Sequence, residues 1–236
     1  MNISTLASVQ NQLIIPSGLI GYWSMQDGGG KIIKDFCGNS TYTNGFLNNP
    51  STLSAGRFGN CLYFNGTNNV VDIPDSTYLL PMTNDWSVSV WIKYNSQSSI
   101  VPIIIKRTNG GSYTQIQMGI GYVDSSGNGQ TTNQLYLFSY PNLNGIHTNS
   151  SFGDNQWHHV VFIRPSSNAS SIWVDGINQN LTTDTNSGVV NINNLGTDWT
   201  FGGAPTEGFF YNGYMQDVRF YNKVLNASEI NALYTL

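Results

Sequence analysis

The sequence has little charge, and basic residues are especially few. Of its 236 residues, 9 are Lys or Arg and 13 are Asp or Glu, so 9% are charged, against roughly a quarter in typical soluble domains. The formal net charge is −4, and the basic residues form no cluster. A surface that neutralises phosphates needs such a cluster. We therefore expect neither nucleic acid nor an anionic lipid surface as a partner.

Long apolar runs are missing as well. A membrane-spanning helix needs about 18 or more apolar residues, and the longest candidate, Ile100–Lys106, is interrupted by Pro102. The N-terminal stretch has no basic start, and Leu13–Ile15 is too short for the apolar core of a signal peptide. We therefore expect no membrane insertion and see no signal peptide.

Cysteine is scarce. Cys37 and Cys61 form neither a CxxC pair nor a metal-ligand cluster. Two free buried thiols and one disulfide are both compatible with the sequence. Since 24 residues separate the two positions, a bridge formed in an oxidising compartment would stabilise the fold by about 3 kcal/mol through the lost entropy of the unfolded chain.

Aromatic residues, in contrast, are abundant and spread along the chain, which indicates a folded protein. Apolar residues alternate with polar ones in many short segments, and clusters of Gly, Asn, Ser and Asp separate these segments. Trp86–Tyr94 is the clearest example, with Trp86, Val88 and Val90 on the face expected to be core. Asp175-Gly176 between two apolar runs predicts a hairpin. The pattern predicts an all-β sandwich of antiparallel strands.

The C-terminus carries the one helical signal. Asn226 is placed to cap a helix, and Glu229 three residues later is placed to bond back to the cap, so we expect a short helix to about Tyr234. No internal repeat is evident. We predict an N-terminal arm over residues 1–17 and one domain over residues 18–236.

Six segments, in order, resemble the laminin G-like (laminin G and pentraxin type) branch of the concanavalin A-like lectin/glucanase superfamily. They are Gly21-Tyr22-Trp23 with Asp35 and Gly38-Asn39, then Gly56–Gly66, Trp86–Lys93, Gln156–Val160, Ile172–Gly176 and Asn212–Tyr221. The resemblance covers most of the chain. It implies a jelly-roll sandwich of two curved antiparallel sheets with the short C-terminal helix.

Catalytic residues are not expected. The glucanases of the superfamily carry paired carboxylates on one strand, because a retaining mechanism needs a nucleophile and an acid/base about 5 Å apart. The two Glu of this chain are Glu207, in a Gly/Pro loop, and Glu229, in the helix cap. No predicted strand carries two acids at alternating positions. We therefore expect no enzyme activity, and glycoside hydrolysis least of all.

Calcium is the cofactor that the resemblance implies, since many relatives bind one calcium ion. Asp217 matches an Asp of the glucanase closing strand, and the Gly59 carbonyl matches a second ligand. Asp35 and Asn39 are alternative loop ligands, because Ca²⁺ prefers oxygen. The alternative for Asp217 is an ion pair with Arg219, which shares its strand face.

A glycan site needs exposed aromatic rings with amides nearby, because sugar C–H faces stack on rings while hydroxyls form hydrogen bonds. Trp199 and the run Phe209, Phe210 and Tyr211 are predicted to lie in loops, where they would form such a platform. Packing of the core is the alternative role for these rings.

The histidines are expected to be structural. His158 and His159 are neighbours on a predicted strand, so their side chains point to opposite faces and cannot bind one metal. His147 is placed in a loop with no acid at an informative spacing. No Ser/His/Asp arrangement is predicted.

The sequence favours a non-catalytic recognition or assembly protein. Its amide-rich, nearly uncharged composition suits a structural or surface component of a particle, such as a viral capsid, decoration or fibre protein, with protein neighbours as partners. The alternative is a secreted carbohydrate-binding lectin or adhesion module with glycan partners. The expected location is a virion or the extracellular surface.

Overall fold

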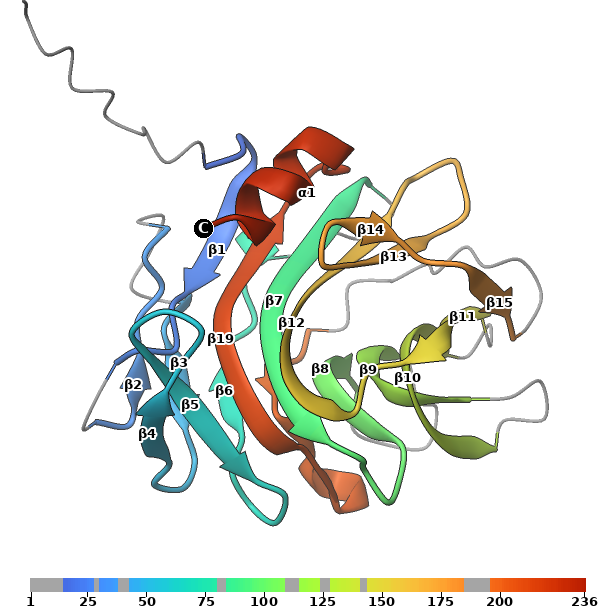
Figure 1. The fold of residues 1–236 in the computed structure, drawn as a ribbon. Coiled ribbons are helices and arrows are strands. Elements are labelled where there is room, and N and C mark those ends of the chain that lie inside the picture. Colours follow the sequence, from blue (N-terminus) through green and yellow to red (C-terminus); the bar gives the residue numbers. More distant parts are fainter. Residues whose placement is uncertain are drawn as a thin grey trace, which may run out of the picture.

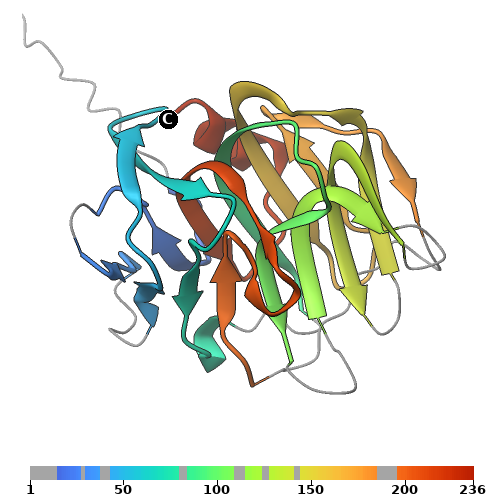
Figure 2. The same ribbon diagram turned by 90° about the horizontal axis from the view of Figure 1, so that it is seen from below.

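The fold is an all-β sandwich of two antiparallel sheets with one short helix near the C-terminus, which confirms the predicted class (Figure 1; Figure 2). The computed structural model describes residues 15–27, 30–37, 43–79, 84–108, 115–123, 128–140, 144–184 and 196–236. Residues 1–14, most of the predicted arm, lie outside these ranges. Within the ranges, no helix is long and apolar enough to span a bilayer.

One sheet has eight strands, with β7 and β19 at its centre. Its spatial order is β14 (Ile177–Asn178), β13 (Ser171–Val174), β12 (Asp154–Arg164), β7 (Trp86–Asn95), β19 (Asn212–Tyr221), β5 (Asn60–Asn65) and β4 (Thr52–Ala55). β1 (Leu19–Trp23) also pairs with β19, over Val218–Tyr221. The first and last strands of the domain are therefore neighbours.

The other sheet has nine strands. Its spatial order is β15 (Leu181–Thr183), β11 (Asn144–Ser151), β10 (Gly129–Tyr140), β9 (Gln115–Val123), β8 (Val101–Arg107), β16 (Trp199–Phe201), β6 (Val71–Ile73), β3 (Gly45–Leu47) and β2 (Ile32–Ile33). A small third sheet pairs β17 (Gly203–Ala204) with β18 (Phe209–Phe210). Two 3₁₀ turns, η2 (Thr77–Leu79) and η3 (Pro205–Glu207), complete the connections.

The main core lies between the two large sheets. Alternate residues of the long strands enter it, such as Val88, Val90 and Ile92 of β7 and Val160 and Phe162 of β12, and all are at most 2% exposed. This is the face that the period-2 pattern predicts to be core. Burial of this apolar surface supplies the main driving force for folding.

The opposite face of β7 is also largely buried, which the alternation did not predict. Helix α1 (Ala227–Tyr234) explains this, because it lies over this face of the sheet (Figure 1). Tyr234 stacks on Trp91 of β7 with ring centroids 5.9 Å apart, and Ile230 and Leu233 form a second apolar cluster with Val161 and Ile163 of β12. The Ser87 hydroxyl joins β7 to the helix entry, since it donates to the Lys223 carbonyl at 2.8 Å. The helix thus covers one end of the outer face of the eight-stranded sheet.

Both local turn signals are confirmed. The Asn226 side chain accepts from the Glu229 amide at 3.0 Å, and the Glu229 carboxylate accepts from the Asn226 amide at 3.1 Å, so the capping box is complete. Asp175 and Gly176 connect β13 to β14 with φ values of 51° and 78°, as a two-residue hairpin of type I′ requires.

Candidate functional site

A cavity of about 420 Å³ opens on the outer face of the nine-stranded sheet. Three of its lining residues, Asp72, Thr200 and Ile105, stand opposite one another on β6, β16 and β8. The lining residues are Asp72, Ile105, Arg107, Thr197, Asp198, Thr200, Ala204, Pro205, Thr206 and Glu207. The sheet register therefore makes the floor, and the segment around η3 makes one wall.

Three carboxylates from separate elements meet in this cavity. Asp72 accepts a hydrogen bond from the Thr200 hydroxyl at 3.0 Å. Burial raises the pKa of Asp72, the Thr200 bond lowers it, and the nearby Asp198 raises it further. Glu207 forms an ion pair with Arg107, and its Oε2 atom is buried with no hydrogen-bond partner in the described structure. This cluster was not predictable from local sequence patterns, because 126 residues separate Asp72 from Asp198.

The buried side chain of Lys106 fixes one of the segments that line the cavity. Lys106 Nζ lies 2.6 Å from Asp75 Oδ1 and also donates to the Thr197 carbonyl. Burial lowers the pKa of Lys106, whereas the bond to Asp75 raises it. The Asp75 amide in turn donates to Asp198 at 2.8 Å. These bonds fix Thr197 and Asp198 relative to the sheet, so this part of the cavity is preorganised.

The cavity presents mainly hydrogen-bonding groups to a ligand. Its carboxylates accept hydrogen bonds, and the hydroxyls of Thr197, Thr200 and Thr206 both donate and accept. Ile105 and Pro205 supply small apolar surfaces beside them. This mixture fits a small molecule that is rich in hydroxyl groups.

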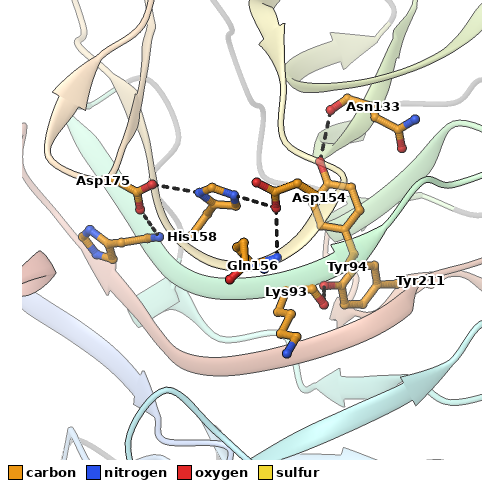
Figure 3. Close-up of polar contacts among 9 residues, drawn as sticks. Lys93, Tyr94, Asn133, Asp154, Gln156, His158, Asp175 and Tyr211 are labelled. Carbon is orange, nitrogen blue, oxygen red and sulfur yellow. Dashed lines mark hydrogen bonds and ion pairs between the residues drawn. The ribbon is translucent and has the colours of Figure 1, made fainter.

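The predicted aromatic platform does not form as a unit. Trp199 and Tyr211 are fully buried in the core. The Trp199 indole donates to the Leu79 carbonyl, and the Tyr211 hydroxyl donates to the Tyr214 carbonyl. The Tyr211 hydroxyl also donates to the Lys93 carbonyl (Figure 3). The prediction that these two rings bind a ligand is wrong, because each ring fills space between the sheets.

The other two predicted rings, Phe209 and Phe210, form strand β18 and are half-buried. Phe210 lines a second cavity, of about 340 Å³, together with Gln97, Ser98 and Asn212. Phe210 is therefore the member of the predicted run that lies beside a polar cavity.

The predicted calcium ligands are occupied by protein donors. Both oxygens of Asp217 bond to the Arg219 guanidinium. Burial raises the pKa of Asp217, although Arg219 lowers it. Asp35 accepts from the amides of Tyr22 and Cys37 and from the Thr43 hydroxyl. The ion pair that the sequence left open as the alternative is thus present, and the calcium site stays a prediction.

The remaining two ligand candidates give no support either. The Gly59 carbonyl, the predicted ligand atom, accepts from the Gly56 amide at 2.9 Å. Asn39 lies outside the described residues. The described ranges hold no group of three or more His, Cys, Asp or Glu arranged for a metal ion.

The two cysteines are free in the structure. The Cys37 thiol donates to the Leu19 carbonyl at 3.2 Å, and the Cys61 thiol donates to the Ser54 carbonyl at 3.5 Å. Of the two alternatives that the sequence left open, the structure has the free thiols, because each sulfur is directed to a different carbonyl. Burial raises the pKa of Cys61 to about 11, so the thiol stays protonated at neutral pH.

The adjacent histidines point to opposite faces of the sheet, as predicted. His158 lies between Asp175 and Asp154, at 2.8 Å and 3.1 Å from their carboxylates (Figure 3). Burial lowers its pKa, but the bonds to the two carboxylates outweigh burial and leave the pKa raised. His159 bonds to the Ser89 hydroxyl at 2.8 Å on the other face, and burial lowers its pKa to about 3.

His147 corrects a further expectation. It lies in strand β11 rather than in a loop, and it has an acid beside it. Its Nδ1 atom is 2.6 Å from Asp184 Oδ1, and the Tyr122 ring stacks on it with centroids 4.0 Å apart. The spacing of 37 residues between His147 and Asp184 gave no signal, because pairing of β11 with β15 creates the contact.

The structure thus defines a β-sandwich domain with a polar cavity on its surface. A family model described as the Concanavalin A-like lectin/glucanases superfamily, of laminin G type, matches residues 65–231. The chain belongs to this family. No curated protein matches the sequence significantly.

Solved structures share the fold at low sequence identity. Trypanosoma rangeli sialidase matches 93% of this chain with a TM-score of 0.63 and 17% identity, and the chain spans only 33% of the sialidase. The binding domain of Paraclostridial Mosquitocidal Protein 1 matches with a TM-score of 0.67 and 15% identity, over 92% of this chain and 52% of that one.

A third similar structure is an isolated domain. Domain 4 of AbnA, an extracellular arabinanase from Geobacillus stearothermophilus, was solved in complex with arabinotriose. It has a TM-score of 0.65 and 16% identity, over 92% of this chain and 98% of that domain. At these identities the likeness establishes the fold alone.

Proposed function

We propose that this chain is a non-catalytic carbohydrate-binding domain that takes a neutral oligosaccharide in the cavity of the nine-stranded sheet. The observation that carries the proposal is the preorganised lining of carboxylates and threonine hydroxyls around Asp72, Asp198 and Glu207. Such groups match the alternating donors and acceptors of sugar hydroxyls. The similar AbnA domain, named for its complex with arabinotriose, supports this class of ligand.

The role is proposed as binding rather than hydrolysis because the carboxylates serve as acceptors within the protein. Glu207 pairs with Arg107 and accepts from the Thr206 hydroxyl at 2.7 Å. Asp198 accepts from the Asp75 amide. An acid catalyst needs a carboxyl that is free to donate its proton to the leaving group, whereas both carboxylates here are engaged by protein donors.

Extracellular display is part of the proposal, since free glycans and glycan-coated surfaces are found there. The particle-component hypothesis, with a virion as its location, finds no support in the three similar structures above, which by their titles are a sialidase, a toxin binding domain and an arabinanase domain. The carbohydrate-binding alternative is the better supported of the two.

Calorimetric titration with arabinotriose tests the proposal. We expect the parent to bind and Glu207→Gln or Asp198→Asn to weaken binding about tenfold, because each variant removes a charged acceptor. Asp85→Asn is the matched control. Asp85 also accepts a backbone amide, at 2.7 Å from Ser166, but lies outside the cavity and should bind like the parent.

Three results would contradict the proposal. Equal binding by all four proteins would place the ligand elsewhere, and no binding of arabinotriose or of other neutral oligosaccharides would remove the cavity as a sugar site. Cleavage of the oligosaccharide by the parent, lost in Glu207→Gln, would show that the domain is an enzyme.

A further inference from the structure

One row of side chains crosses the outer face of the eight-stranded sheet beyond the part that α1 covers. Tyr63, Tyr214, Lys93 and Trp157 stand opposite one another on β5, β19, β7 and β12. All four are half-buried, and their strand neighbours, such as Met215, enter the core. With strands about 4.8 Å apart, the row is about 14 Å long. We call these four residues the aromatic strip.

The rings of the strip are close enough to act as one surface. The centroids of Tyr63 and Tyr214 are 5.0 Å apart, and those of Trp157 and Tyr214 are 6.3 Å apart. Lys93 stands between Tyr214 and Trp157 in the pairing order, and its Nζ atom lies 5.8 Å from the Tyr214 centroid. Half-exposed rings in a row offer stacking surfaces for the apolar faces of successive sugars.

Hydrogen-bonding groups continue from one end of the strip. The Tyr63 hydroxyl donates to Asn212 Oδ1 at 3.2 Å. Asn212 also lines the polar cavity of about 340 Å³, with Ser96 and Gln97. An extended ligand that continues from Tyr63 past Asn212 therefore meets amides and hydroxyls.

The charge of this face is opposite to that of the whole chain. Neither Lys93 nor Arg57 forms an ion pair with a carboxylate of the described residues. Arg57 instead lies over Trp91, 5.3 Å from the ring centroid, two residues before Lys93 on β7. The row itself contains no carboxylate. In a chain of net charge −4, two cations without acidic partners beside three rings are complementary to an anionic ligand.

We propose that the aromatic strip binds an acidic oligosaccharide, with Tyr63, Tyr214 and Trp157 stacking on its sugars and with Lys93 and Arg57 pairing with its carboxylate or sulfate groups. This inference rests on the proposed carbohydrate-binding function, but it concerns a second surface on the other sheet. The cavity takes neutral sugar through its acceptors, and the strip takes charged sugar through its rings and cations.

The test compares hexagalacturonate with its methyl ester, which has the same backbone without charge, and adds a heparin-derived hexasaccharide as a sulfated probe. We expect the parent to bind both acidic probes at least tenfold more tightly than the ester at low salt. Trp157→Ala should weaken binding of the acidic probes tenfold or more. Lys93→Gln should reduce the preference for the acid over its ester severalfold, because Arg57 remains as the second cation.

Matched controls come from the same chain. Lys34→Gln removes an exposed lysine and Phe36→Ala an exposed ring, both outside the strip, and both should bind like the parent. Thermal melts confirm that each variant is folded. Arabinotriose binding should be unchanged in the strip variants, whereas Glu207→Gln should leave hexagalacturonate binding intact.

The outcomes separate the two sites. Equal affinity for the acid and its ester, or no binding of either acidic probe, overturns the acidic specificity. If Trp157→Ala and Lys93→Gln both bind the acidic probes as tightly as the parent does, the ligand lies elsewhere and the proposal that the aromatic strip binds it is wrong. If the cavity variants lose binding of arabinotriose but still bind the acidic probes like the parent, the substitutions affect only the cavity and the two sites are separate.

Discussion

The outer faces of the two sheets differ in how they are built. On the nine-stranded sheet, the segment around η3 rises over β8 and β16 and encloses carboxylates and threonines in a cavity. On the eight-stranded sheet, strand pairing alone sets three tilted rings and Lys93 in one row. The same sandwich therefore carries an acceptor-rich cavity on one side and a cationic aromatic surface on the other. The difference shows that a connecting segment is needed to wall off the cavity, whereas the pairing register of the strands is enough to form the row of rings.

The largest expected effect on stability distinguishes two cations of the eight-stranded sheet. Arg219 stabilises the fold, whereas Lys93 is proposed to bind ligand. Arg219 is buried and paired with Asp217, so Arg219→Met leaves a buried charge uncompensated and should destabilise the fold by about 3–5 kcal/mol. Lys93→Gln should change stability by less than about 0.5 kcal/mol, because Lys93 is half-buried and is not ion-paired with any described acid. Urea unfolding measures both.

The same experiment examines the calcium hypothesis. Both Asp217 oxygens are bonded to Arg219, so EDTA should leave the parent unfolding curve unchanged. A similar stability for Arg219→Met and the parent would contradict the ion-pair account. A parent that loses stability in EDTA and regains it with calcium would restore the metal site.

Helix α1 covers one end of the outer face of the eight-stranded sheet. Shortening the side chain that packs this helix onto the sheet should have the next largest effect on stability. Leu233 is 2% exposed and packs in the cluster over β12. Leu233→Ala should cost about 2–4 kcal/mol through lost burial and the remaining cavity. Ala232→Ser, on the less buried side of the same helix, is the control and should cost under about 1 kcal/mol. Equal melting temperatures for the two variants would show that α1 is not fixed on the sheet.

A smaller effect on folding stability depends on pH and distinguishes His158 from His159, whose side chains lie on opposite faces of β12. Burial gives folded His159 a pKa of about 3, against about 6.5 in an unfolded chain. Its contribution to stability is therefore complete above pH 6.5 and is lost as the pH falls toward 3. The raised pKa of His158 has the opposite sign, so its contribution is complete below pH 6.5 and is lost as the pH rises through the folded value.

Melting temperatures of His159→Gln and His158→Gln across pH 4 to 8 measure this pair. The difference between the parent and His158→Gln should be larger at pH 5 than at pH 8. His159→Gln should melt with a weaker dependence on pH below 6.5 than the parent does. Parallel curves for the parent and both variants would contradict the assigned partners of the two rings.

The sequence predicted those parts of the fold that local patterns specify. The alternation in Trp86–Tyr94, the Asp175-Gly176 turn and the capping box at Asn226 all depend on neighbouring residues, and all were confirmed. The burial of both faces of β7 was not predictable in this way, because the helix that covers the outer face is more than 130 residues away in the sequence.

The candidate sites were harder to predict for the same physical reason. Asp72 and Asp198 meet only because β6 pairs with β16, which brings Asp198, just before β16, next to the segment that follows β6. Trp199 and Tyr211 are predicted from the sequence to lie in loops, but their rings are buried in the core. Trp157 and Tyr214 face outward as strand alternation implies, yet only the pairing register shows that their rings meet.

The most direct test of the account is a mapping of amide shifts in ¹H–¹⁵N spectra during two titrations, one with arabinotriose and one with hexagalacturonate. The account predicts that arabinotriose shifts amides around Asp72, Asp198 and Glu207, whereas hexagalacturonate shifts amides around Tyr63, Lys93 and Trp157. Shifts of the same set by both sugars, or no shifts with either, would contradict the claim that the two sheets carry separate glycan sites.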